Sequence, residues 1–474
     1  MTNLLPCKTK IVATIGPASE SQEMMERLIR AGLSIARLNF SHGDFSGHAG
    51  RIQNLRAAAK AVGRPIVIMA DLPGPKMRIG SITPDPVNLK AGDPFILTTD
   101  EIPGTPQRVS VSFKRLPQVV QKGRRLYLND GLVQLSVDRV DGNDVHCRVE
   151  VGGELRSKKG LNLPGMDLGI SAFTEHDRAC LEFAIKNGVD AVSQSFVEKA
   201  ADLEAVRNAA RSLGGNPFLI AKIERADALE HYDDILAAAD GIMVARGDLG
   251  VEVPLEGMAL TQKNLIARAN RAGKPVITAT QMLESMTASR LPTRAEATDV
   301  ANAVLDGTDA VMLSAESAVG KFPEEAVATL ARIAAATEKG RPRVHLDDAP
   351  LPGTRYSGAD ALARVVEYSL TLAAFSVVLV PTRTGTTARM ISRFKPGEWI
   401  VALAHDPAVA QGLQYSYGVL PRWVERDPES WGPFLKQTLQ EQCPSSGLAL
   451  LVAGPSTSHP DAHHRVEFFP FENR

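Results

Sequence analysis

Residues 217–250 read PFLIAKIERADALEHYDDILAAADGIMVARGDLG, and their pattern predicts both the fold and the position of a site. One apolar run ends at Lys222 and Glu224, a short helical segment follows, and a second apolar run, 241–245, ends just before Asp248. Side chains alternate between the two faces of a strand, so Lys222 and Glu224 point the same way. If the two runs are neighbouring parallel strands, an ammonium and two carboxylates meet at their C-terminal ends. Burying them is costly unless a metal or an anionic substrate lies among them; the alternative is a structural Lys–Glu ion pair beside an exposed Asp248.

Length and composition set broad limits. The 474 residues leave room for two or three domains, each with its own core. The net charge of −1 gives no electrostatic reason to expect binding to nucleic acid or to a membrane surface. No apolar stretch has the length of a membrane span and the first ten residues lack a signal-peptide core, so we expect a cytoplasmic protein. Scattered cysteines are expected to be free thiols: Cys7, Cys147, Cys180 and Cys443.

The unit of an apolar strand followed by an amphipathic helix recurs along the chain. The predicted strands are nearly continuous apolar runs, as expected when both faces of a parallel sheet are covered. They span 10–15, 34–40, 66–70, 189–195, 217–223, 241–245, 275–279 and 309–313. Eight such units favour a (β/α)₈ barrel over an open doubly wound sheet. We expect the barrel domain to comprise residues 1–72 and 164–340.

Two segments depart from this repeat. From 73 to 163, short β-like runs and turn signals such as Asp130-Gly131 predict an all-β domain inserted into a βα loop. An insertion at that rim would lie over the active-site mouth and serve as a lid, with a passive role as the alternative. Residues 350–474 predict a C-terminal α/β domain that includes a helix over 429–441, whereas 456–474 show no clear pattern.

Polar residues follow the predicted barrel strands, where parallel barrels carry their chemistry. The residues collected there are Arg37, Asn39, Ser41, His42, Asp71, Lys222, Glu224, Gly247, Asp248 and Thr280. Two carboxylates suit a hard divalent ion such as Mg²⁺, which needs few protein oxygens beside those of a substrate. Arg37, Lys222 and Arg78 supply positive charge for phosphoryl oxygens. The residues alone therefore predict metal-assisted chemistry on a small phosphorylated anion and no more.

Longer motifs resemble those of the pyruvate kinase family. They are KIVATIGP (10–17), ARLNFSHG (36–43), IMVARGDLG (242–250), ATQMLESM (279–286) and the run from PTRAE (292–296) to Ala315-Glu316. The resemblance covers the barrel, the insertion and, more loosely, the last domain. It implies a barrel with a β lid and a C-terminal regulatory domain, transfer of a phosphoryl group from phosphoenolpyruvate to ADP, and a homotetramer.

The resemblance also implies roles for single residues. Glu224 and Asp248 match ligands of Mg²⁺ (or Mn²⁺), and the backbone amides of Gly247 and Asp248 with Thr280 match a cradle for the substrate carboxylate. Lys222 matches the lysine that stabilises the transferring phosphoryl group. Arg37 matches the phosphate-binding arginine, and Thr280, through water, the neighbourhood that protonates the enolate. The nucleotide side is matched by Asn39, Ser41, His42, Arg78 and Lys159, with ordinary loop hydrogen bonding as the alternative for His42.

One position departs from the family pattern. Most relatives carry Asp-Thr-Lys-Gly-Pro-Glu after the third strand and need K⁺, bound partly by the matches to Asn39, Ser41 and Asp71. Residues 71–76 of this chain read DLPGPK, with Lys76 at the glutamate position. We expect the Lys76 ammonium to supply the charge that K⁺ provides elsewhere, so that Lys76 takes part in catalysis and K⁺ is not required.

The C-terminal domain contains PTRTGTTAR (381–389), a glycine-bearing turn between a predicted strand and helix. Its amides and hydroxyls could cradle a phosphate. In the family this position binds a phosphorylated effector; a simple Thr-capped turn is the alternative. The expected effector loop comprises Thr382, Arg383, Thr384, Gly385, Thr386 and Thr387.

Two other functions stay open at this stage. A metal-dependent barrel aldolase or lyase would also handle a pyruvate enolate with carboxylate ligands, but it would need neither ADP nor a lid. A catalytically silent sensor would bind a metabolite through the last domain without turnover.

Overall fold

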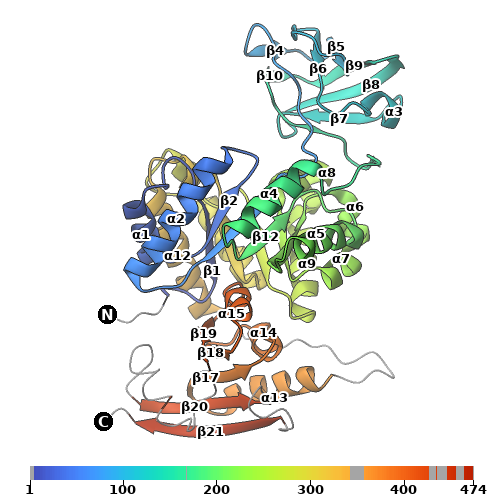
Figure 1. Cartoon of the computed structure of the whole chain (residues 1–474). Helices are drawn as coiled ribbons and strands as arrows, with labels where there is room; N and C mark the ends of the chain where they lie inside the picture. The colour runs from blue at the N-terminus through green and yellow to red at the C-terminus, as the bar shows by residue number, and fades with distance from the viewer. Residues whose placement is uncertain are drawn as a thin grey trace.

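The structure is a computed structural model that describes residues 5–166, 168–341, 357–425, 434, 446–454 and 464–472. A central barrel carries the inserted β domain above it and the C-terminal α/β domain beneath it (Figure 1). Within the described ranges, no helix combines the length and apolarity that a membrane crossing requires. Cys7, Cys147 and Cys180 are free and buried, and Cys443 lies outside the described residues.

The barrel is closed by parallel strands in the order β1-β16-β15-β14-β13-β12-β3-β2, which confirms the predicted (β/α)₈ fold. The strands are β1 (Lys10–Thr14), β2 (Leu33–Asn39), β3 (Val67–Leu72), β12 (Ala191–Gln194), β13 (Phe218–Ile223), β14 (Gly241–Ala245), β15 (Val276–Ala279) and β16 (Ala310–Leu313). Both faces are buried: Val12, Met243 and Ile277 fill the interior, while alternate residues such as Ile11 and Ile242 pack against the helices. These apolar runs are the signal from which the fold was predicted.

Helices cover the outside of the barrel and form its loops. They are α1 (Gln22–Ala31), α2 (Phe45–Val62), α4 (Glu175–Lys186), α5 (Ala200–Ser212), α6 (Ala226–Glu230), α7 (Tyr232–Ala238), α8 (Arg246–Glu252), α9 (Met258–Arg271), α10 (Arg294–Asp306), α11 (Ala315–Ala318) and α12 (Pro323–Gly340), with the short 3₁₀ turns η1 (Leu255–Gly257) and η2 (Glu284–Thr287). Local sequence explains several ends. Thr174 and Thr293 form capping boxes at the starts of α4 and α10, and Gly307 ends α10 in the left-handed conformation.

The inserted domain is an all-β unit with its own core. Its elements are β4 (Val87–Leu89), β5 (Pro94–Thr98), β6 (Arg108–Ser110), α3 (Leu116–Val119), β7 (Arg125–Leu128), β8 (Val133–Asp141), β9 (Asp144–Val151), β10 (Gly153–Leu155) and β11 (Leu161–Asn162). Six strands form a sheet in the order β11-β7-β8-β9-β5-β6, and β10 pairs with β4. Figure 1 shows the domain above the barrel, connected to it by the segments that enter and leave it.

The C-terminal domain contains a sheet in the order β19-β18-β17-β20-β21. Its elements are α13 (Gly358–Leu372), β17 (Phe375–Thr382), α14 (Thr386–Ser392), β18 (Trp399–Ala404), α15 (Pro407–Leu413), β19 (Val419–Trp423), β20 (Ser446–Ala453) and β21 (Arg465–Glu472). The expectation of no pattern over 456–474 is wrong for β21, which pairs antiparallel with β20. The predicted helix over 429–441 lies, apart from Phe434, outside the described residues.

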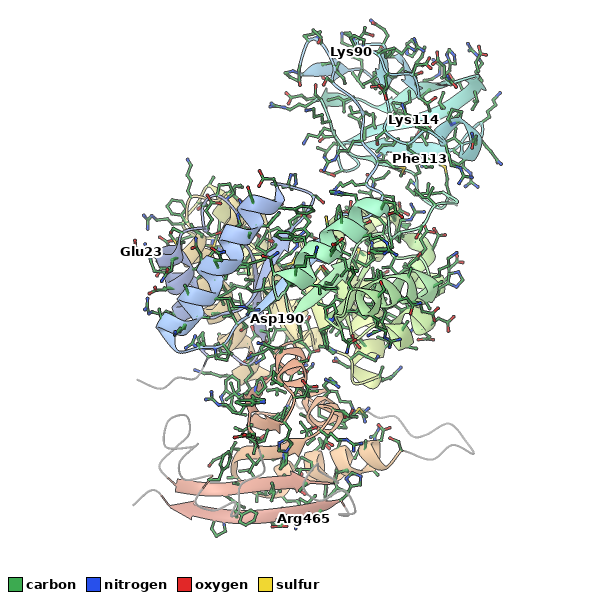
Figure 2. All side chains as sticks on the ribbon, in the orientation of Figure 1. Glu23, Lys90, Phe113, Lys114, Asp190 and Arg465 are labelled. Atoms are coloured by element: carbon green, nitrogen blue, oxygen red, sulfur yellow. The ribbon has the colours of Figure 1, made fainter. Side chains whose placement is uncertain are left out.

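The C-terminal domain covers the N-terminal end of the barrel, where Asp190 is labelled in Figure 2. Tyr415, 1% exposed, follows α15 and stacks on Phe218 of β13 with ring centroids 4.9 Å apart. Asp309, just before β16, accepts a hydrogen bond from Tyr417 N at 2.9 Å and lies 2.6 Å from Lys395 Nζ. Aromatic packing and buried charge therefore attach the two domains.

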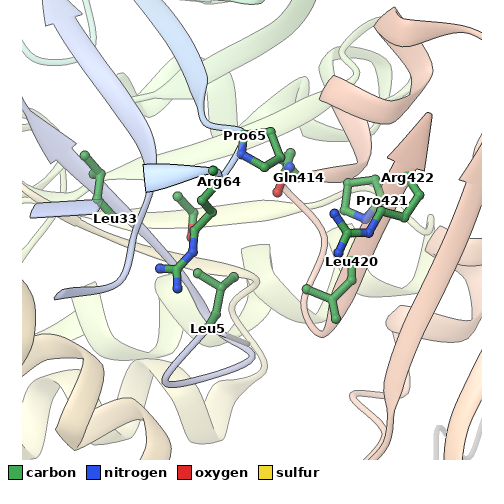
Figure 3. Close-up of a pocket in the computed structure, with 10 residues that line it drawn as sticks. Leu5, Leu33, Arg64, Pro65, Gln414, Leu420, Pro421 and Arg422 are labelled. Carbon is green, nitrogen blue, oxygen red and sulfur yellow. The ribbon is translucent and has the colours of Figure 1, made fainter. Parts of the chain in front are cut away.

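A small cavity of about 40 Å³ remains at this seam. Figure 3 shows Leu33 and Arg64 of the barrel side facing Leu420 and Arg422 of β19 across it.

Substitutions at Tyr415 measure how much this aromatic plug stabilises the protein. The phenol oxygen is buried without a hydrogen-bond partner, and an unsatisfied buried hydroxyl costs about 1–3 kcal/mol, so Tyr415→Phe should keep or raise the stability. Tyr415→Ala should lower the free energy of unfolding by about 3–5 kcal/mol because it leaves a cavity. Urea and thermal unfolding followed by circular dichroism measure both. An alanine variant with the wild-type midpoint would contradict a stabilising role for the plug.

Candidate active site

Lys222 and Glu224 converge at the C-terminal end of β13, as their alternation predicts. Lys222 Nζ lies 3.4 Å from Glu224 Oε2, and the side chains of Lys222 and Glu224 are only 12% and 1% exposed. β13 and β14 are parallel neighbours, so Asp248, in the first turn of α8, follows the adjacent strand. The three charged residues of the opening motif therefore belong to one end of the barrel.

Asp71 of β3 is the buried centre of the charge network. Its Oδ2 accepts a hydrogen bond from Arg37 Nε at 2.9 Å, and its Oδ1 accepts one from Ser193 Oγ at 2.7 Å and lies 3.5 Å from Lys222 Nζ. Burial by itself would raise the pKa of Asp71, but Lys222 and Arg37 hold it below its ordinary value. The sequence placed Asp71 only in the pocket for a monovalent cation and did not predict that it neutralises both cations.

Lys222 and Arg37 are fixed by neutral partners as well. Lys222 Nζ donates to Ser195 Oγ at 2.6 Å, and Arg37 Nη1 donates to Thr14 Oγ1 at 2.9 Å. Burial would lower the pKa of Lys222, but the carboxylates of Asp71 and Glu224 outweigh it and the pKa is raised. Both side chains thus carry positive charge in a fixed position, as binding of a phosphoryl group requires.

The two carboxylate oxygens of Glu224 have different partners. Oε1 accepts a hydrogen bond from Phe196 N at 2.7 Å, whereas Oε2 is buried, accepts no hydrogen bond from the described residues and is ion-paired with Lys222 at 3.4 Å. Burial raises the pKa of Glu224 to about 7, with Lys222 opposing this rise and Asp248 adding to it. Among the described residues no cluster of three or more His, Cys, Asp or Glu could hold a metal. A cation here would therefore rest on Glu224 and Asp248 alone, which fits Mg²⁺ because it takes its other oxygens from substrate and water.

Thr280 lies in a strained conformation after β15. Its φ is 69°, a left-handed value that costs a β-branched residue about 1–3 kcal/mol. Two contacts hold it there: Gly247 N donates to Thr280 Oγ1 at 2.8 Å, and Arg246 Nη2 donates to Thr280 O at 2.7 Å. Arg246 also pairs with Asp299 at 2.8 Å. This positioning role of Arg246 was not predicted, although the residue stands inside the motif that carried the resemblance.

The residues expected on the nucleotide side lie around the entrance to the inserted domain. Asn39 Oδ1 accepts a hydrogen bond from Ser41 N at 3.1 Å. His42 is exposed, and partial burial together with the cations Arg78, Lys76 and Arg37 lowers its pKa. Arg78 and Lys159 both belong to the inserted domain, where Arg78 forms a β-bridge with Gly160, the neighbour of Lys159.

Lys76 does not enter the expected pocket for a monovalent cation. Its side chain is exposed, and no ion pair between described residues includes its ammonium; Asp71 pairs with Arg37 and Lys222 instead. Lys76 is instead one of the cations whose charge lowers the pKa of His42.

The segments that enter and leave the inserted domain are both anchored to the barrel beside the active-site residues. Gly74 has φ +63°, and a Cβ there would come within 2.9 Å of the Phe196 ring and 3.0 Å of Ser195 O. Arg225, 2% exposed, donates from Nη2 to Met166 O at 3.0 Å and lies 3.3 Å from Glu198 Oε1. Neither anchor was predicted, since arginine is rarely fully buried.

The expected effector loop is hydrogen-bonded to itself. Gly385, with φ +80°, donates from its amide to Thr382 Oγ1 at 2.9 Å. The hydroxyls of Thr384 and Thr386 lie 2.9 Å apart. Arg383 is exposed beside them.

Fixed cations and carboxylates at the C-terminal mouth of a (β/α)₈ barrel define an enzyme of the barrel class that acts on small anions. The family model "Pyruvate kinase, barrel domain" matches residues 7–327, and "Pyruvate kinase, alpha/beta domain" matches residues 360–454. The chain belongs to the pyruvate kinase family, whose enzymes transfer a phosphoryl group between phosphoenolpyruvate and ADP. Membership favours this phosphotransferase over the lyase and the silent sensor.

Individual relatives agree with this assignment. A pyruvate kinase of Thermococcus litoralis is 49% identical over 421 residues, which cover 87% of this chain and 88% of that protein. One of Geobacillus stearothermophilus is 42% identical over 415 residues, or 87% and 71% of the two chains. The crystal structure of a pyruvate kinase from Cryptosporidium parvum is similar with a TM-score of 0.87 and 35% identity, over 98% of this chain and 96% of that one.

Two glycine substitutions separate backbone strain from displacement of the site. Gly63 and Gly74 both have positive φ, but a Cβ at Gly63 meets nothing within 4 Å. Gly63→Ala should therefore cost only about 1 kcal/mol of stability and leave turnover unchanged. Gly74→Ala should in addition lower kcat/KM by about tenfold or more, because the partners of Lys222 and Glu224 must move. Steady-state kinetics and thermal unfolding of both variants test this; equal kinetics in the pair would contradict it.

Proposed function

We propose that the chain is a Mg²⁺-dependent pyruvate kinase whose metal is held by Glu224 and Asp248. The observation that carries this proposal is the buried Oε2 of Glu224, which accepts no hydrogen bond from the described residues and has Lys222 Nζ at 3.4 Å as its ion-pair partner. Asp71, Glu224 and Asp248 outnumber Arg37 and Lys222, so a divalent cation would offset the excess negative charge. The chemistry that Mg²⁺ supplies when bound is neutralisation and orientation of phosphoryl oxygens. Mn²⁺ suits the same oxygens.

The substrate would lie between the cations and the Thr280 turn. Arg37 and Lys222 bind the phosphoryl group, and the charge of Lys222, maintained by Asp71 and Glu224, stabilises it during transfer. The amides of Gly247 and Asp248 with the Thr280 hydroxyl bind the carboxylate. Since Gly247 N already donates to Thr280 Oγ1, the carboxylate would replace or share this hydrogen bond. Proton delivery to the enolate carbon belongs to the neighbourhood of Thr280, through water.

The nucleotide would bind at the entrance to the inserted domain. Asn39, Ser41 and His42 come from the loop after β2, whereas Arg78 and Lys159 come from the inserted domain itself. Because both sides are needed, the inserted domain acts as a lid that brings its two cations to the phosphates of ADP.

Regulation and assembly are proposed from the C-terminal domain. The exposed Arg383 beside the 382–387 loop suits a phosphorylated effector.

Val365, Tyr368 and Leu372 of α13 are 53%, 63% and 69% exposed. Their spacing forms one apolar face, as an interface of the proposed homotetramer would. Sedimentation equilibrium checks the assembly. The proposed location is the cytoplasm.

Amide substitutions test the metal ligands. Glu224→Gln and Asp248→Asn should each lower kcat by about 100-fold or more and raise the Mg²⁺ concentration needed for half-maximal rate, because the ligand charge is lost. Glu256→Gln, on an exposed side chain of η1, is the matched control and should behave as wild type. A dehydrogenase-coupled assay of pyruvate release over a Mg²⁺ series measures both quantities. Full turnover with unchanged Mg²⁺ dependence in either variant would place the metal elsewhere.

Rates without potassium test the role of Lys76. Initial rates in K⁺-free sodium or Tris buffer should change less than about twofold when K⁺ is added, since the ammonium supplies a positive charge at the entrance. Lys76→Glu should lower the K⁺-free rate and make the enzyme K⁺-activated. Lys90→Glu makes the same charge change at an exposed position of the inserted domain and should stay K⁺-independent. Strong K⁺ activation of the wild type is the contrary result.

A further inference from the structure

A cavity of about 440 Å³ lies at the seam between the barrel and the C-terminal domain. Its walls are the arm before β1, the end of α12 and the loop before β18, together with Tyr417. This cavity is far larger than the one of about 40 Å³ in Figure 3, although Leu5 lines both. It belongs neither to the catalytic mouth nor to the 382–387 loop.

The lining of this cavity carries an excess of positive charge. Its cations are Lys8, Lys339, Arg341 and Lys395, and among the described lining residues Glu338 alone is acidic. The Glu338 carboxylate is already engaged, because it accepts hydrogen bonds from Lys8 N at 3.0 Å and from Thr9 N at 2.7 Å. Lys395 pairs with Asp309. The four lining cations thus outnumber Glu338 and Asp309, the two carboxylates whose charges act on Arg341.

Several donors of these cations are buried without acceptors. Among the described residues, Arg341 Nε and Nη1 have no hydrogen-bond partner, although the guanidinium also interacts with Tyr417. Lys395 is 7% exposed. Its backbone has φ +51°, a left-handed conformation that is costly for a residue with a side chain. Burial lowers the pKa of Lys395 to about 8 despite Asp309, and burial lowers the pKa of Arg341 as well. The positive charges at the seam are thus only partly balanced by nearby carboxylates and hydrogen-bond acceptors.

A purely structural reading is that the cations neutralise the C-terminal end of the α12 dipole. Cations in that role donate to the last carbonyl groups of the helix. Within the part of the chain that the structure describes, Arg341 Nε and Nη1 make no such bond. A dianion with several acceptor oxygens would satisfy these donors.

We propose that this interdomain cavity binds a small phosphate ester, whose phosphate is held by Arg341, Lys339 and Lys8. The ligand would contact the barrel arm, α12 and the C-terminal domain at once, so its binding strengthens their attachment. The site is distinct from the effector loop, and it does not depend on the proposed roles of the catalytic residues.

Calorimetric titration of the full-length protein with β-glycerophosphate, and in parallel with inorganic phosphate, tests the proposal. The double variant Lys339→Gln/Arg341→Gln should bind the ester at least about tenfold more weakly, since hydrogen bonds from charged donors are lost. Arg178→Gln/Lys186→Gln, at exposed positions of α4, is the matched control and should bind as wild type. The ester should also raise the thermal midpoint of the wild type and of the control, but not that of the double variant.

Two further variants distinguish this cavity from the other anion sites. Binding should persist in Lys222→Met, which alters the active site, and in Arg383→Gln, which alters the effector loop. Loss of all binding in either variant would overturn the proposal, as would unchanged affinity in Lys339→Gln/Arg341→Gln. Thermal unfolding without ligand shows that the variants are folded, so weaker binding reports on the cavity.

Discussion

The catalytic end of the barrel depends on one buried carboxylate, that of Asp71, held between Arg37 and Lys222. Removing such charges from water costs several kcal/mol per ion unless partners stand at hydrogen-bond distance. The strand register supplies them: Asp71 lies opposite Asn39 of β2 and opposite Ser193 of β12. A slip of one residue would turn Asp71 toward the helices, leaving Arg37 without its carboxylate and Lys222 with Glu224 alone. The register of β3 and the electrostatics of the site therefore constrain each other.

The two ends of the barrel bury charge in opposite ways. At the C-terminal mouth the group without a hydrogen-bond partner among the described residues is an anion, Glu224 Oε2, which has only the Lys222 ammonium at 3.4 Å and would accept a second cation. At the N-terminal seam the unsatisfied groups are the donors of Arg341, and Asp309 must serve both Lys395 and Tyr417 N. A barrel filled with apolar side chains separates the two ends, so each keeps its own charge balance.

The sequence predicted the features that depend on a short-range pattern of side chains along one strand. Apolar runs marked the barrel strands, and alternation placed Lys222 and Glu224 on one face. The partners of Asp71 were not predictable in this way, because Ser193 lies 122 residues further on and is brought there only by the β3–β12 pairing. Strand β21 was missed for a related reason. Its run of Phe468, Phe469 and Pro470 shows no clean alternation, yet an edge strand tolerates proline when one neighbour supplies the pairing.

Both connections of the inserted domain meet the barrel at residues that hold Glu224. On the entering side, Gly74 packs against Phe196, whose amide donates to Glu224 Oε1. On the leaving side, Met166 O is held by Arg225, the next residue after Glu224. A rotation of the inserted domain must strain one or both of these contacts, since the packing around the buried Arg225 and at Gly74 leaves little free space. Arg78 and Lys159 move with the inserted domain. Through these contacts their position is coupled to that of Glu224, the proposed metal ligand.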